Sequence, residues 1–116
     1  MLAKRYRFHG YGSLKFLYNK GAVVRSRYCN LKYIHNPRRE DSRLAIVVAK
    51  KVSKKAPVRN RIRRRLYEAI RQHWAMIPPG HDMIVTVFDP VVAEISTDHL
   101  NKIVLDLLTQ ADLLKK

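Results

Sequence analysis

The sequence is poor in several residue types, and each shortage excludes a class of protein. Cys29 is its only cysteine, so no internal disulfide can form, and we expect a buried thiol in a reducing compartment. With only four glycines and five prolines, the chain is not typical of disordered proteins. No segment approaches the roughly 20 apolar residues of a membrane span, and the N-terminus has no apolar stretch of signal-peptide length. We therefore expect a soluble, cytoplasmic protein.

Acidic residues are also scarce, with nine against 24 Lys and Arg, and the formal net charge is +15. The imbalance is uneven along the chain. Residues 1–76 hold 21 basic and three acidic residues, whereas residues 77–116 hold three basic and six acidic residues. Such asymmetry gathers the basic potential on one part of the surface, which indicates a polyanionic partner. Nucleic acid is the leading candidate.

The remaining composition is that of a globular protein. The chain has 116 residues, of which 47% are hydrophobic, and it contains six Tyr, three Phe and one Trp. A chain of this length buries roughly two-thirds of the surface that it exposes when unfolded, which is enough for one core. We expect a single nucleic-acid-binding domain over residues 1–116.

Apolar periodicity and turn residues predict the order α-β-β-β-α-β-α. This order favours an α+β fold, a two-layer sandwich of helices packed on a small sheet. The predicted elements are a helix over 13–19, one bent strand or two paired strands over 22–35, a strand over 43–50, a helix over 57–77, a strand over 81–88 and a helix from 96 or 97 to 114.

The segment Lys50–Arg71 carries ten basic residues and continues into an amphipathic helix. Four of its arginines fall on the arc opposite the apolar residues, where Glu68 is the only acid; they are Arg61, Arg64, Arg65 and Arg71. A solvated charged face is the general alternative. The uncompensated repulsion favours contact with nucleic-acid phosphates. Asn60 either bonds a sugar or base edge or has a structural role in the first helical turn.

These residues resemble the Arg-Asn-Arg signature of the bacterial ribonuclease P protein subunit. The signature is Lys50-Lys51, a short basic spacer and then Arg59-Asn60-Arg61-Ile62-Arg63-Arg64 before an amphipathic helix. The resemblance extends over almost the whole chain, from Arg7 and Phe8 to the Pro-Pro-Gly break, the valine-rich strand and the final helix. It implies the ribosomal protein S5 domain 2-like fold, with a left-handed β-α-β crossover around the basic helix, which sequence physics alone does not predict.

The resemblance implies a protein subunit that binds a catalytic RNA and the 5′ leader of precursor tRNA, and assists removal of that leader. The catalytic centre is then expected in the RNA, with Mg²⁺ bound mainly by RNA and none held tightly by the protein. The expected partners are the ribonuclease P catalytic RNA and precursor tRNA, with no membrane and no obligate protein partner. The residues implied to bind the catalytic RNA are Lys50, Lys51, Lys54, Lys55, Arg59, Asn60, Arg61, Arg63, Arg64 and Arg65.

A second surface is implied for the single-stranded leader, in a cleft between the first helix and the exposed sheet face, where aromatic rings serve as stacking platforms. The residues assigned to this leader cleft are Phe8, Tyr18, Tyr28, Lys32 and Tyr33, although each can equally belong to the core. Leu14 departs from the family pattern, which commonly has phenylalanine there, and leucine stacks poorly.

Other chemistry has little support in the sequence. The five histidines show no metal-ligand spacing, and the nine acids form no convincing pair for acid and base catalysis or for a two-metal nuclease. A ribosomal or general RNA-binding protein without a processing role is the alternative within binding proteins. A stand-alone endonuclease is the alternative from a different class.

Overall fold

The computed structural model describes residues 6–7, 17–36 and 40–114. Four strands form one mixed sheet in the order β1-β2-β4-β3. The β1–β2 and β2–β4 pairs are antiparallel, and β3 and β4 are parallel. The strands are β1 (Ala22–Arg25), β2 (Cys29–His35), β3 (Arg43–Val48) and β4 (His81–Val87). Two paired strands therefore occupy the region where the sequence allowed either one bent strand or two.

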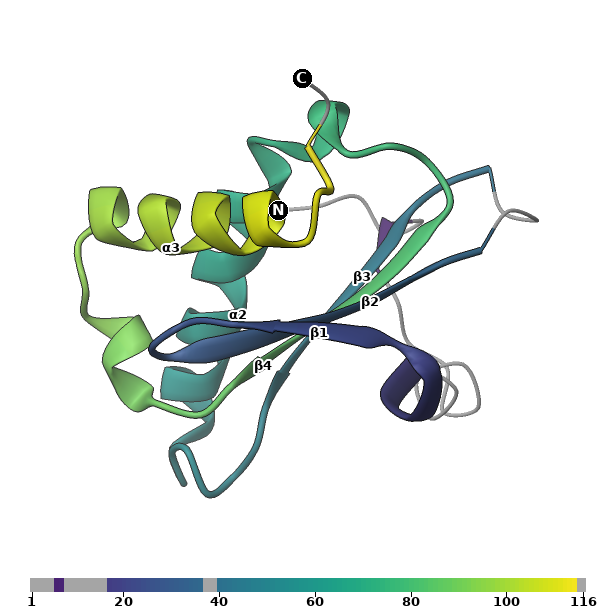
Figure 1. Cartoon of the computed structure of the whole chain (residues 1–116). Helices are drawn as coiled ribbons and strands as arrows, with labels where there is room; N and C mark the ends of the chain where they lie inside the picture. The colour runs from purple at the N-terminus through teal and green to yellow at the C-terminus, as the bar shows by residue number, and fades with distance from the viewer. Residues whose placement is uncertain (1–5, 8–16, 37–39, 115–116) are drawn as a thin grey trace.

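The structure also describes two long helices. The helix α2 (Ala56–Arg71) connects the parallel neighbours β3 and β4, which makes a β-α-β crossover, and α3 (Thr97–Gln110) follows β4. Figure 1 shows α3 on one side of the sheet and the helical turn at residues 17–20 on the other side. The predicted α+β sandwich is confirmed.

Side-chain alternation along the strands divides the core between the two faces of the sheet. On the face covered by α2 and α3, Leu31, Leu44 and Met83 are buried in the main hydrophobic core. On the opposite face, Leu17 covers Ala45 and Ile84 in a much smaller cluster. The rest of this opposite face, called the open face below, is not covered by any described helix.

Gly21 holds the helical turn at residues 17–20 close to the sheet. Its N–H donates to Leu17 O at 2.8 Å, and an added Cβ would lie 2.7 Å from that oxygen and 3.1 Å from Tyr33 O. A larger residue would push the turn away from β2, so glycine fixes the entry into β1 at this close approach.

The helix after the basic connector is shorter than the sequence predicts. The α-helix α2 ends at Arg71, and a 3-10 helix, η2 (Trp74–Met76), replaces its expected last turns. The chain tightens where His73 N–H donates to Ile70 O, and the Trp74 ring then packs on Tyr6 with 5.4 Å between ring centroids. Tertiary packing of Trp74 has overridden a periodicity that continued to Ile77.

A second 3-10 helix, η3 (Pro90–Ala93), lies between β4 and α3 and was not predicted. The Asp89 carboxylate caps it by accepting from Val91 N–H at 2.9 Å. At the start of α3 the predicted cap is confirmed, because Ser96 Oγ accepts from His99 N–H at 3.1 Å. Both η3 and α3 contact α2.

Candidate nucleic-acid interface

The helix α2 separates an apolar face from a basic face. Ile62, Leu66 and Ile70 are buried against the sheet, while Arg64 and Arg71 are exposed. Pro57 stands in the first turn, where its missing N–H costs no helical hydrogen bond. No acidic residue lies in that turn. The start of α2 is therefore positive in both its side chains and its backbone dipole.

The connector between β3 and α2 presents its four lysines to solvent, and they are Lys50, Lys51, Lys54 and Lys55. Val52 anchors the connector, because its side chain is buried and its N–H donates to Ala49 O at 3.0 Å. Arg59 secures the far end, because Arg59 Nη1 donates to Ser53 O at 2.8 Å. Arg59 thus orders the connector while the lysines remain available to an anionic partner.

Two of the predicted RNA-binding arginines reach across to η3. Arg61 Nε donates to Ala93 O at 2.8 Å, and Arg65 Nη1 donates to Val92 O at 2.7 Å. Arg65 Nη2 donates to Ile95 O as well. Burial lowers the pKa of Arg65, and the positive charge of Arg61 lowers it further. Hydrogen bonds to neutral carbonyls therefore offset part of the repulsion among the arginines of α2. The sequence interpretation had expected nucleic-acid phosphates to do this.

The other polar residues of α2 divide into pairs and one exposed arginine. Arg63 Nη2 donates to Asn60 Oδ1, and this places Asn60 in a side-chain contact within the helix. Arg71 bonds the Glu68 carboxylate and is the main cause that lowers the Glu68 pKa to about 2. Arg64 is exposed and donates no hydrogen bond to any of the described residues. Its guanidinium is thus available to an anionic partner.

Tyr18 and Lys32 meet on the open face of the sheet, as the sequence interpretation expected. Lys32 lies on β2, and its ammonium sits 5.1 Å from the centroid of the Tyr18 ring and donates to Tyr18 O. Tyr18 is 40% exposed, so much of its ring surface remains free. An exposed ring beside a fixed cation suits a nucleobase and its phosphate.

Tyr28 and Tyr33 correct the sequence interpretation, because they do not join Tyr18. Both are packed against the main core on the helix-covered side. The Tyr33 position follows from register, since it alternates with Lys32 along β2. The Tyr28 ring contacts His99 of α3, with 6.1 Å between ring centroids. Phe8 and Leu14 lie outside the described residues.

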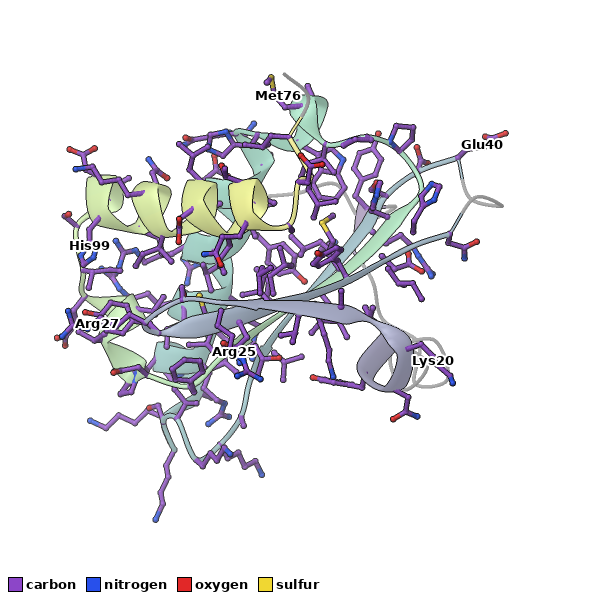
Figure 2. All side chains as sticks on the ribbon, in the orientation of Figure 1. Lys20, Arg25, Arg27, Glu40, Met76 and His99 are labelled. Atoms are coloured by element: carbon purple, nitrogen blue, oxygen red, sulfur yellow. The ribbon has the colours of Figure 1, made fainter. Side chains whose placement is uncertain are left out.

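The open face also carries polar residues that the sequence interpretation did not assign to the leader cleft. Arg25 of β1 pairs with Asn30 of β2, which pairs in turn with Thr86 of β4. All three share the parity of Lys32 along their paired strands. Figure 2 shows Arg25 and Lys20 on the side of the sheet below β1. Asn30 lies two residues from Lys32 on β2, but Arg25 and Thr86 are related to Lys32 only through strand pairing, so their place on this face cannot be predicted without the strand register.

Within the described ranges, no group of three or more His, Cys, Asp or Glu could hold a metal ion. Cys29 is buried, and burial raises the pKa of its thiol. None of the described helices combines the length and the apolar character needed to cross a membrane.

Comparisons with known proteins agree with this fold. The family model described as Ribonuclease P matches residues 2–112. The Ribonuclease P protein component of Roseiflexus castenholzii is 45% identical over 74 residues, which cover 64% of this chain but only 60% of the relative. The protein of the same name from a Cyanothece strain is 30% identical over 129 residues and covers 98% of both chains.

Solved structures show the same arrangement of elements. The RNase P protein of Staphylococcus aureus superposes with a TM-score of 0.83 and 25% sequence identity, covering 95% of this chain and 98% of that one. The matched family model spans nearly the whole chain, and the shared fold places the Arg-Asn-Arg segment on α2. The chain therefore belongs to the Ribonuclease P protein family.

Proposed function

We propose that this chain is the protein subunit of a ribonuclease P holoenzyme and assists removal of the 5′ leader from precursor tRNA. The observation that carries the proposal is the presence of two separate cationic surfaces on one fold. One is the exposed connector lysines and Arg64 of α2, called the basic surface below. The other is the open face around Tyr18 and Lys32.

The basic surface has the chemistry to bind the catalytic RNA. The connector lysines supply mobile point charges, and arginine supplies planar donors for bidentate phosphate contact. Arg61 uses only its Nε on Ala93 O in the described contacts, which leaves its terminal amino groups for a phosphate. In this proposal Arg59, Asn60, Arg63 and Arg65 support the basic surface through the contacts that they make within the protein.

The open face suits the single-stranded leader. Bases can stack on the Tyr18 ring while Lys32, Arg25 and Lys20 lie near the backbone phosphates. The positions of Tyr28 and Tyr33 leave Tyr18 as the aromatic platform among the described members of the predicted cleft. The two surfaces then allow the protein to hold the catalytic RNA and the substrate at the same time.

In this proposal the bond-breaking chemistry belongs to the RNA. The described residues offer no cluster for a metal ion, and Mg²⁺ would be bound mainly by the RNA partner. The chain would lower the Mg²⁺ concentration that the RNA needs, because its cations neutralise phosphates that otherwise repel one another.

Reconstitution tests the proposal directly. A bacterial ribonuclease P RNA is incubated with precursor tRNA at low Mg²⁺, with and without the chain. We expect 5′-leader cleavage only when both are present. Cleavage by RNA-free protein would indicate a stand-alone endonuclease, and binding to ribosomal RNA without any effect on cleavage would indicate a ribosomal or general RNA-binding protein.

A further inference from the structure

A groove runs between α2 and the first turns of α3. Its part near the C-terminal end of α2, called the inner pocket below, has a volume of about 250 Å³. The residues that line it include Arg64 and Glu68 of α2, its C-cap Gln72, and Thr97 and Asn101 of α3. A second pocket of about 270 Å³ is lined by Pro57, Arg61, Arg64 and Arg65. Because Arg64 and Arg65 line both pockets, the two adjoin and form one groove.

The chemistry of the groove changes along its length. Arg61 and Arg64 make the outer end cationic. Ala69 and Leu100 are buried and give the inner end an apolar floor. The side-chain amides of the inner walls can each donate and accept hydrogen bonds. A phosphate, a flat apolar ring and a hydrogen-bonding ring edge therefore each find a matching part of the groove.

Glu68 affects which end of a bound nucleotide enters the inner pocket. Its pKa of about 2, lowered mainly by the hydrogen bond from Arg71, keeps the carboxylate ionised at neutral pH. Because the Glu68 carboxylate faces this pocket and no acid among the described residues lines the adjoining one, a phosphate is attracted less strongly here than beside Arg61 and Arg64. The same carboxylate attracts an exocyclic amino group of a base. A bound nucleotide is thus oriented with its phosphate outward, toward Arg61.

Asn101 supplies an independent observation. Its Oδ1 is buried and has no hydrogen-bond partner among the described residues. An unsatisfied buried acceptor is destabilising, and native structures contain few of them. Because the terminal torsion of asparagine is broad and roughly two-fold, a rotation can present this oxygen to the groove. A donor on a bound ligand would then satisfy it.

The size of the inner pocket limits the occupant. Small-molecule sites usually occupy about 300 to 1,000 Å³. At about 250 Å³ the inner pocket has room for one base at most, and the phosphate of the same nucleotide would occupy the adjoining pocket of about 270 Å³. Sequence-specific RNA recognition generally uses unpaired bases that are splayed out, stacked on arginine or aromatic planes, and bonded at their edges. The groove offers these contacts, whereas the connector lysines offer charge alone.

We propose that the groove between α2 and α3 binds one unpaired nucleotide of the RNA partner. Its phosphate lies at Arg61 and Arg64, its base lies on the apolar floor, and its base edge meets Gln72 and Asn101. This inference rests on the proposed function and adds a base-reading contact on α3 to it.

The test uses three uncharged substitutions in the full chain bound to a bacterial ribonuclease P RNA. Gln72→Ala and Asn101→Ala remove the proposed base contacts, and Gln110→Ala is the matched control. Gln110 is an amide on the same helix α3, but it bonds Arg25 O at the other end. Affinity is measured across a salt series, thermal unfolding is measured for each variant, and 2′-hydroxyl acylation maps each RNA nucleotide.

We expect Gln72→Ala and Asn101→Ala each to weaken RNA binding about tenfold at every salt concentration, because each loses a base contact of about 1.4 kcal/mol. The salt slope should not change, since no charge is removed. One nucleotide that is reactive in free RNA should be protected by the wild-type chain and by Gln110→Ala. It should become reactive again with either groove variant, while the unfolding temperature of Gln72→Ala, at the exposed end of α2, stays unchanged.

Two results would overturn this inference. If the wild-type chain binds the RNA but both groove variants match Gln110→Ala in affinity and in acylation pattern, the groove reads no nucleotide and the proposed function stands. If the wild-type chain does not bind the RNA at all, the proposed function is wrong. This inference is then wrong as well, because it rests on that function.

Discussion

Replacing Arg65 with alanine should destabilise the fold and leave the electrostatic part of RNA binding intact. Arg65 donates to Val92 O at 2.7 Å and also to Ile95 O, so its removal leaves two carbonyls without a charged donor. Each such hydrogen bond contributes about 1.5 to 3 kcal/mol, and water will replace part of it, which gives a loss of roughly 2 to 4 kcal/mol. For a chain of this size the unfolding temperature should fall by roughly 10 to 20 °C.

Arg64→Ala is the matched control, because Arg64 is the neighbouring arginine and is exposed. Its unfolding free energy should stay within about 0.5 kcal/mol of wild type. Its RNA binding should instead become less dependent on salt: the slope of log K against log salt concentration should become shallower by about 0.7 to 0.9, the effect of one lost phosphate contact. Thermal unfolding and a salt series of binding measurements separate the two variants. If Arg65→Ala unfolds like Arg64→Ala and loses the same salt slope, the assignment of Arg65 to η3 is wrong.

Three further predictions concern other surfaces. Tyr18→Ala should weaken precursor tRNA binding by the holoenzyme by about 1 to 3 kcal/mol and leave mature tRNA binding unchanged, and equal losses for both substrates would contradict leader stacking. The Glu68 carboxyl should titrate near pH 2 by NMR and return toward 4.5 in Arg71→Ala. Since its pKa is lowered in the fold, its stabilising effect is present above about pH 4.5 and is lost as the pH falls toward 2. Asp82→Asn should cost about 2 kcal/mol in urea unfolding, because Asp82 is buried and accepts two hydrogen bonds of 3.0 Å from Arg43; an unchanged midpoint would show that this ion pair contributes nothing.

Local pattern was sufficient for most elements of this fold. The Pro-Pro-Gly break, the β-branched residues of β4 and the Ser96 cap each act over a few residues, so they can be recognised in the sequence. The basic face of α2 was equally predictable, because helical spacing alone separates Arg64 from Ile62 and Leu66. The early end of α2 was not, since it depends on Trp74 packing against Tyr6, about 70 residues away in sequence.

The two candidate surfaces differ in how far the sequence determined them. The composition and the Lys50–Arg71 segment were enough to predict a helix with one basic face, because charge and 3.6-residue spacing are properties of the chain itself. Which arginines remain available was decided by tertiary structure, since the carbonyls that Arg61 and Arg65 bond lie about 30 residues further along the chain. Strand register decided the rest: one step along β2 separates Lys32 on the open face from Tyr33 on the core side, and only pairing with β1 and β4 fixes that choice.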